Sequence, residues 1–269
     1  MSNPDATHKI ILHHGVGSNG RLLTAIIGVA LVKRGYEVVA IDMPLYGMSE
    51  NNEPSITYED WLDVSCQLIE SETQRDGKPI ILYGLSAGGM LAYHVACMEP
   101  RVKGIVGMCF LDLADQSVTD MISPFPALIE HLSISFMNVV GSSPLKKMRV
   151  PMKLICKMTA LTNDKAMLKT LLSDQHSAGA WVPFNFLASL FNYKAAKTPE
   201  EFDVCPVLLT QPAVDTWTPL AASQKFYDRL ATTKSIVMLE GAGHYPLEMP
   251  GLQQLIDGID HFIKGLPSK

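Results

Sequence analysis

The chain has 269 residues, of which 47% are hydrophobic and 18% charged, a balance typical of a packed globular enzyme and unlike a disordered chain. Its net charge is −5 and it has no block of basic residues, so neither a nucleic-acid-binding surface nor a nucleic-acid partner is expected. The longest apolar runs fall far short of the roughly 20 residues of a membrane-spanning helix. Residues 1–7 lack the basic start and apolar run of a secretory signal.

The length favours one domain with a large insertion over two equal domains. The first half alternates short apolar runs with longer amphipathic ones, which indicates strands alternating with helices. Strands that are apolar throughout predict a parallel sheet covered by helices on both faces. The segment from Thr57 is predicted to begin a helix with a capping box, because Asp60 follows three residues later. The predicted strands are 9–13, 37–42, 79–84 and 102–110; the helices are 21–34, 57–75 and 87–98; and 43–55 is a loop.

This alternation stops after Leu111. The next 90 or so residues contain helical stretches and prolines but few strand signals, and they are too hydrophobic to be a solvated linker. The alternation then resumes, so the sequence predicts an α/β core of residues 1–112 and 205–269 interrupted by an insertion at 113–204. Helices are predicted at 165–172 and 185–193 in the insertion and at 219–230 and 252–263 after it, with strands at 206–211 and 235–239.

The cysteines are odd in number, widely spaced and mostly within apolar stretches. This pattern is typical of buried free thiols in a reducing compartment, so we expect a cytoplasmic protein. There is no C-x-x-C pair to suggest a zinc or redox site. The five residues are Cys66, Cys97, Cys109, Cys156 and Cys205.

A G-x-S-x-G pattern surrounds Ser86. By itself the pattern is weak, and the plain alternative is a Gly-rich turn in a Rossmann-like unit. An apolar predicted strand leads into it and a predicted helix leads out, however, and a nucleophile at such a sharp turn requires small neighbours two residues away. Gly84 and Gly88 provide that space, and the helix N-terminus favours developing negative charge. We therefore expect Ser86 to be a nucleophile.

A serine hydroxyl needs a general base, and that base needs an acidic partner. His244 is the best candidate base, because glycines flank it in a loop after the last predicted strand. Asp215 is predicted to orient it from the loop after the preceding strand, with Asp112 or Asp115 as rivals. The chain order Ser, Asp, His is that of α/β hydrolases and differs from the orders in chymotrypsin-like and subtilisin-like folds.

Two backbone N–H groups must bind the oxyanion of a tetrahedral intermediate. Ala87 should supply one, and Val16 is the expected second, in the glycine-containing loop after the first strand. His14 and Gly15 in that loop, together with Trp181 and Trp217, are predicted to contact substrate. The main role expected of His13 and His14 is to shape the loop.

No metal or other cofactor is expected. His13-His14 lacks further ligands at metal-binding spacing. There is no Walker-type loop, and residues 15–18 are too short a glycine signal for dinucleotide binding.

As a set, these motifs resemble the α/β-hydrolase superfamily, close to its monoglyceride-lipase-like and lysophospholipase-like esterases. The resemblance implies a mostly parallel sheet flanked by helices, with 113–204 as a helical cap over the site and with Asp42 and Gly47 shaping a neighbouring loop. The family usually has an antiparallel strand pair before the first strand found here, and often His-Ser-Met in place of Leu85-Ser86-Ala87. The matching segments are HHGVGS at 13–18, IDMPLYGMS at 41–49, GLSAGG at 84–89, PAVDTWTP at 212–219 and EGAGHYPLEMPG at 240–251.

The predicted function is hydrolysis of a small-molecule carboxylic ester through an acyl-enzyme, by a monomer or homodimer. Thioesterase, lactonase and carbon–carbon bond hydrolase activities use the same residues and stay open, as does a small-molecule receptor with slow turnover. Several apolar residues of the insertion are expected to line an acyl or aromatic pocket: Met121, Ile122, Phe125, Leu128, Phe136, Met137, Met148, and Trp181 to Phe184.

Overall fold

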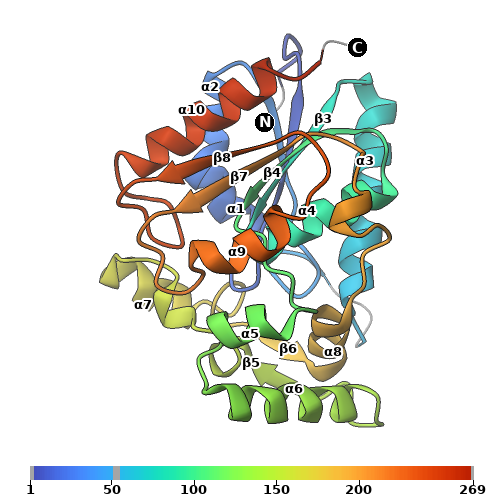
Figure 1. Cartoon of the computed structure of the whole chain (residues 1–269), viewed down its shortest axis with the longest axis vertical. Helices are drawn as coiled ribbons and strands as arrows, with labels where there is room; N and C mark the ends of the chain where they lie inside the picture. Colours follow the sequence, from blue (N-terminus) through green and yellow to red (C-terminus); the bar gives the residue numbers. More distant parts are fainter. Residues whose placement is uncertain (1–2, 51–54, 268–269) are drawn as a thin grey trace.

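The computed structural model describes residues 3–50 and 55–267, so positions 51–54 of the predicted loop lie outside it. Among the described residues, six parallel strands form the central sheet in the order β2-β1-β3-β4-β7-β8 (Figure 1). Every residue of β1 and β3 is buried, as expected for parallel strands covered on both faces. The strands are β1 Lys9–His13, β2 Glu37–Ala40, β3 Ile80–Leu85, β4 Val102–Met108, β7 Val207–Pro212 and β8 Lys234–Leu239.

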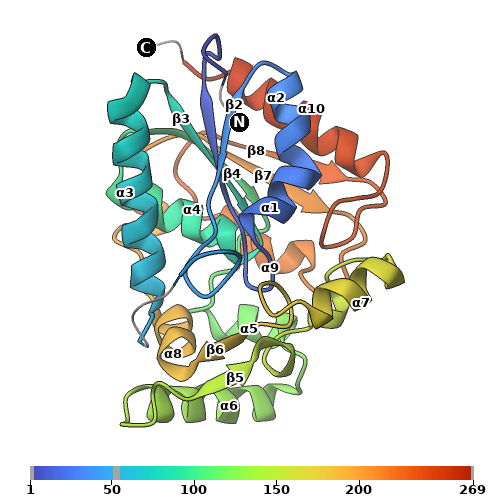
Figure 2. The ribbon, with the colours of Figure 1, turned by 180° about the vertical axis from the view of Figure 1, so that it is seen from behind.

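Helices cover both faces of this sheet. On one face, α10 packs against α2, and on the other, α3 packs against α4 (Figures 1 and 2). The predicted capping box is present, with Asp60 accepting from the backbone N–H of Thr57, and the helix that it begins is closed by Gly77 as C-cap in the left-handed conformation. The helices of the core are α1 Gly20–Leu23, α2 Val29–Lys33, α3 Tyr58–Asp76, α4 Ala87–Met98, α9 Leu220–Tyr227 and α10 Gly251–Lys264.

Several element boundaries differ from the predictions; α9, for example, ends at Tyr227 instead of residue 230. The helix predicted over 21–34 contains a π-helical segment, η1 Thr24–Gly28, between α1 and α2. Strand β2 ends at Ala40 instead of residue 42, and β4 ends at Met108 instead of residue 110. In both cases the apolar run continues into the loop beyond the strand, so hydrophobicity alone does not mark where pairing stops.

The segment between β4 and β7 lies at one end of the sheet (Figure 1). The segment is mainly helical, but β5 Arg149–Pro151 and β6 Trp181–Pro183 form a short antiparallel pair that was not predicted. Strands of three residues that end on proline are too short to show an alternating pattern. The other elements are α5 Gln116–Ile122, α6 Ala127–Gly141, α7 Lys165–Ser173, α8 Phe184–Asn192 and the 3₁₀ turns η2 Met152–Leu154, η3 Met158–Ala160 and η4 Pro199–Glu201. We refer to residues 113–204 as the cap.

None of the helices in the described part of the chain combines the length and the apolar character needed to span a membrane.

Candidate active site

Ser86 occupies a strained turn between β3 and α4. Its φ of 58° and ψ of −123° lie where residues with a side chain are rarely found. The turn exists because its neighbours are glycines: a Cβ at Gly84 would overlap the carbonyl oxygen of Gly88, and a Cβ at Gly88 would overlap that of His13. A hydrogen bond of 2.8 Å from the Ser86 N–H to the carbonyl of Met108 ties the turn to the neighbouring strand. The predicted elbow is therefore present in the backbone.

His244 and Asp215 form a buried pair in the loops that follow β8 and β7. The His244 Nδ1 lies 2.8 Å from Asp215 Oδ2, and both side chains are fully buried. The indole of Trp217 packs on the imidazole with 4.6 Å between ring centroids. The second ring nitrogen, Nε2, is buried and has no hydrogen-bond partner among the described residues. The pair thus holds the imidazole at one nitrogen and leaves the other for chemistry.

The loop around Asp215 fixes its carboxylate. One oxygen accepts from the backbone N–H groups of Trp217, at 2.8 Å, and Thr218, at 3.0 Å, and the other accepts from the Thr218 hydroxyl at 2.6 Å. Burial by itself raises the pKa of Asp215, but the hydrogen bond and charge of His244 and the donors of Thr218 outweigh it and hold the pKa below its ordinary value. Asp215 therefore stays ionised, as a group that stabilises an imidazolium must.

The rival carboxylates have other surroundings. Asp115 accepts from the backbone N–H of Ser117 at 2.9 Å and caps α5. Asp112 accepts from the backbone N–H of Ala114 at 3.2 Å and lines the cavity described below. Neither is hydrogen-bonded to His244 in the described residues, so the structure pairs this imidazole with Asp215.

The loop after β1 lies directly against the nucleophile turn. A Cβ at Gly15 would come within 2.7 Å of the Leu85 carbonyl oxygen and 3.2 Å of the Ala87 nitrogen, so only glycine fits there. Val16 follows Gly15 in this loop, and Val16 and Ala87 both line the same cavity as Ser86. The two N–H groups predicted to bind an oxyanion therefore belong to segments in close contact.

His14 holds this loop in place and does not line the cavity. Its Nδ1 lies 2.8 Å from the Gly15 carbonyl oxygen, and its Nε2 accepts from the Met43 N–H at 2.9 Å. Burial lowers the pKa of His14 to about 4, so the ring is neutral. The expected shaping role fits these contacts. The substrate contacts predicted for His14 and Gly15 do not, because neither residue lines the cavity.

A neighbouring loop is fixed by Asp42. Its two carboxylate oxygens accept from the N–H groups of Gly20, at 2.7 Å, and Met48, at 2.9 Å. Gly47 has a φ of 58° and presses against the Asp42 carboxyl group, leaving no room for a Cβ. These contacts match the shaping role that the resemblance implied for both residues.

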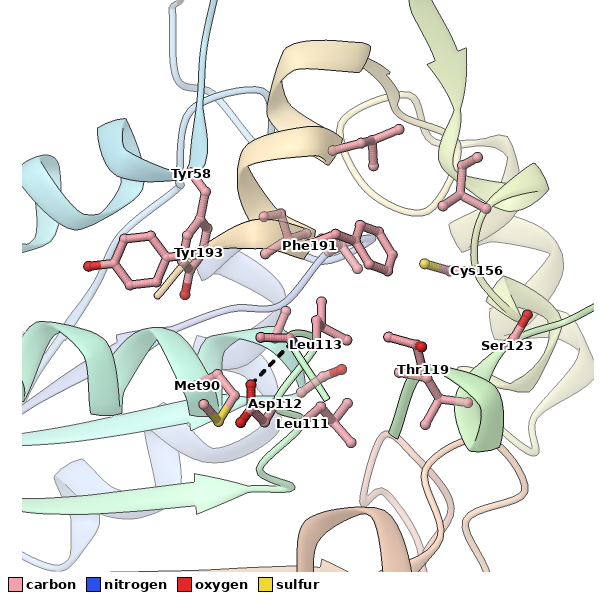
Figure 3. Close-up of a pocket in the computed structure, with 18 of the residues that line it drawn as sticks. Tyr58, Met90, Leu111, Asp112, Leu113, Thr119, Ser123, Cys156, Phe191 and Tyr193 are labelled. Atoms are coloured by element: carbon pink, nitrogen blue, oxygen red, sulfur yellow. Dashed lines mark hydrogen bonds between the residues drawn. The ribbon is translucent and has the colours of Figure 1, made fainter. Parts of the chain in front are cut away.

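A mostly apolar cavity lies between the core and the cap (Figure 3). Ser86 is one of the residues that line it. The space of the cavity, including the open mouth, amounts to about 810 Å³. Tyr58 and Tyr193 lie at one end, and Ser123 and Cys156 lie at the other (Figure 3). Trp217 also lines the cavity, and its contact with substrate stays a prediction.

The cap contributes different residues to this cavity from those predicted. Of the apolar residues expected to line a pocket, only Ile122 does so. The expectation for Trp181 was wrong: it is 51% exposed on β6 and does not line the cavity. Leu128 and Phe136 lie on the exposed face of α6, and Met148 is exposed in the segment that follows this helix. The face of α6 that lines the cavity carries Glu130 instead.

His94 also lines the cavity, although its place in the sequence did not assign it to the site. It lies two helical turns after Ser86, and its Nδ1 is 2.9 Å from the Tyr58 hydroxyl. Burial lowers its pKa to about 3, so the ring is neutral. Its spacing of eight residues from the nucleophile, through Met90 at four, placed it on the same helix face and was the signal that could have identified it.

Cys109, Asp215 and His244 are close enough together to suggest a metal site. The chemistry argues against it. His244 Nδ1 is already bound to Asp215, and burial together with the charge of Asp215 raises the pKa of the Cys109 thiol, which therefore stays protonated and ligates poorly. The thiol instead lies 3.1 Å from the Thr218 hydroxyl.

Several known proteins are similar to this chain. The quorum-quenching protein AidA of Acinetobacter baumannii (strain MDR-ZJ06) is 24% identical over 193 residues, or 69% of this chain; the chain spans 62% of that relative's length. The crystal structure of Paleococcus ferrophilus monoacylglycerol lipase has a TM-score of 0.72 at 20% identity, covering 96% of this chain and 95% of that one. A soluble variant of Saccharomyces cerevisiae monoglyceride lipase has a TM-score of 0.74 at 17% identity, covering 98% and 89%.

These structural likenesses show the fold. The family is shown by a model described as serine aminopeptidase, S33, which matches residues 4–248. The chain therefore belongs to this family and has the α/β-hydrolase fold.

Proposed function

We propose that this protein is a serine hydrolase that cleaves a carboxylic ester through an acyl-enzyme. The observation that carries the proposal is the buried Asp215–His244 pair with an unpartnered Nε2, joined through Trp217 to the cavity that contains Ser86. A buried imidazole nitrogen without a hydrogen-bond partner is costly, and it is the group that a serine hydroxyl requires as its base.

The proposed reaction has two halves. Ser86 Oγ attacks the ester carbonyl while His244 Nε2 takes its proton, and the Val16 and Ala87 N–H groups bind the oxyanion. The imidazolium then protonates the departing alcohol, and the acyl group stays on Ser86. Water, deprotonated by His244, attacks the acyl-enzyme and releases the carboxylic acid. Asp215 stabilises the imidazolium in both halves.

The apolar cavity supports an acyl or aromatic group as the part of the substrate that is bound. A panel of p-nitrophenyl esters of graded acyl length tests this. We expect a clear optimum, because a bounded cavity rejects chains that exceed it. A flat profile across lengths would contradict an acyl-selective cavity.

The Ser86→Ala variant tests the mechanism. Its kcat on p-nitrophenyl butyrate should fall by about 10³–10⁶-fold with the thermal unfolding curve unchanged. Ser142→Ala, at the exposed end of α6, is the matched control and should keep wild-type activity. Full activity in Ser86→Ala would remove this serine from the mechanism. Wild-type turnover far below roughly 1 s⁻¹ on every ester would instead favour a slow-turnover receptor.

A bacterial signalling molecule with a lactone ring is a second candidate substrate. The similarity to a relative named for quorum quenching favours it, and a lactone is a cyclic ester that the same residues would open. Ring opening followed by mass spectrometry, compared between wild type and Ser86→Ala, distinguishes this candidate from linear esters.

A further inference from the structure

The charged side chains that line the cavity are all of one sign. Among its described lining residues there are two carboxyl groups, Asp112 and Glu130, and no lysine or arginine. The single histidine, His94, is neutral because burial lowers its pKa to about 3. The remaining wall is mostly apolar and offers no positive charge to a bound anion.

Asp112 lies at the core side of the cavity. In Figure 3 its carboxyl group is drawn beside Met90, Leu111 and Leu113, and Met90 is one helical turn after Ser86. The Ala114 N–H donates to Asp112, and no cation forms an ion pair with it in the described residues. Burial raises the pKa of this carboxyl group and the nearby Asp115 adds to the effect, whereas the Ala114 N–H and the charge of Arg229 oppose it.

Glu130 is the second carboxyl group and comes from helix α6 of the cap. It is only 5% exposed, and its Oε2 accepts from the Ser123 hydroxyl at 2.6 Å. Ser123 in turn accepts from the Phe125 N–H at 2.9 Å. No ion pair joins Glu130 to a cation in the part of the chain that is described. This buried carboxyl group therefore has a hydroxyl as its donor and, among the described residues, no cation beside it.

The electrostatic effect of Glu130 extends to another residue of the cavity wall, Cys156. Burial and the charge of Glu130 together raise the pKa of the Cys156 thiol, which also lines the cavity, to about 12. Cys156 and Ser123 lie at the end away from Tyr58 and Tyr193 (Figure 3). The two carboxyl groups therefore act on the cavity from different elements, the loop after β4 and helix α6.

We propose that Asp112 and Glu130 make the cavity selective for charge, so that it accepts uncharged ester substrates and rejects ligands that carry a carboxylate or phosphate. An anion entering it loses hydration, gains no cationic partner, and meets two like charges in a medium of low dielectric constant. The proposal rests on the proposed ester hydrolysis for its biological role. In that role, the same field expels the carboxylate product while the neutral ester is retained.

Binding measurements test this without depending on turnover. Octanamide and octanoate have nearly the same shape and differ in charge, and at about pH 8 octanoate is ionised. Their affinities would be measured by isothermal titration calorimetry for wild type, Asp112→Asn, Glu130→Gln and the double variant. Asp120→Asn is the matched control, because Asp120 is a cap carboxylate that does not line the cavity.

Wild type should bind octanamide more tightly than octanoate. Octanoate affinity should rise by on the order of tenfold for each carboxyl group neutralised, with octanamide little changed. Asp120→Asn should leave the ratio of the two affinities as in wild type. A variant that merely damages the cavity would weaken both ligands, so a gain for octanoate alone identifies charge selection.

The proposal is overturned if wild type binds octanoate as tightly as octanamide, a result that needs no variant to fold. It is also overturned if octanoate affinity does not rise in any well-folded variant. Loss of the ester-hydrolase assignment would appear separately, as unchanged activity in Ser86→Ala, and would leave the calorimetric result standing.

Discussion

Replacing Asp215 by Asn should reverse the proton arrangement on His244. Two fixed backbone donors, the N–H groups of Trp217 and Thr218, point at one side-chain oxygen of residue 215. The amide oxygen of an asparagine will take that place, so its NH₂ group faces His244 Nδ1, where an acceptor oxygen now lies at 2.8 Å. An NH₂ donor requires Nδ1 to be unprotonated, which moves the ring proton to Nε2. In that tautomer the imidazole cannot accept the Ser86 proton.

The expected loss in kcat is about 10⁴-fold, or roughly 5.4 kcal/mol of transition-state stabilisation. Initial rates on p-nitrophenyl butyrate measure it, with thermal unfolding as the check that the fold survives. Asp115→Asn is the control, because asparagine can still cap α5 and activity should stay within a few-fold of wild type. If Asp215→Asn kept activity within tenfold of wild type, the tautomer argument and the role of Asp215 would both be wrong.

Three further outcomes follow from the geometry. Gly84→Ala should disrupt the nucleophile turn and lower the free energy of unfolding, measured by urea denaturation, by more than about 3 kcal/mol. Gly265→Ala is the control and should be nearly neutral, because Gly265 has a φ of −85° and its nearest neighbouring atoms are 3.5 Å from the added Cβ. Equal stability of the two variants would contradict the steric argument. Trp217→Phe removes the 3.1 Å hydrogen bond from the indole N–H to the Ile122 carbonyl, which joins the Asp215 loop to the cap. This variant should lower the free energy of unfolding by roughly 1 kcal/mol. An unchanged free energy of unfolding would show that the hydrogen bond contributes nothing to stability. The pKa of His94 is lowered from 6.5 to about 3 in the folded state, so as the pH falls the unfolded chain takes up the proton first. This residue should therefore reduce the free energy of unfolding by roughly 1.4 kcal/mol per pH unit below pH 6.5. In urea titrations His94→Gln should flatten that slope, and an unaltered slope would refute the idea that His94 is buried in its neutral form.

Local sequence was sufficient for the elements of the core. Buried strands such as β3 can be identified in the sequence as apolar runs, and the capping box at Thr57 marks the start of α3. The turn at Ser86 could also be predicted, because its glycines are needed within two residues of the serine. These features depend on neighbours in sequence, so their physical causes are visible there.

The cap shows where such prediction failed. Helix α6 has apolar residues around most of its circumference, so periodicity could not say which face is buried. Packing against α8 and α5 decided it, turning Glu130 toward the cavity and leaving Leu128 and Phe136 exposed. The position of Trp181 was likewise set by the pairing of β5 with β6.

From the sequence alone came the α/β alternation, the Ser86 turn, and the expectation that Asp215 and His244 come together, since parallel strands bring the loops at their carboxyl ends to one edge. Only the tertiary structure decided which side chains line the cavity and what charge they bring to it. The reason is that burial of a cap residue depends on contacts with segments far away in the chain, and no local pattern records those contacts.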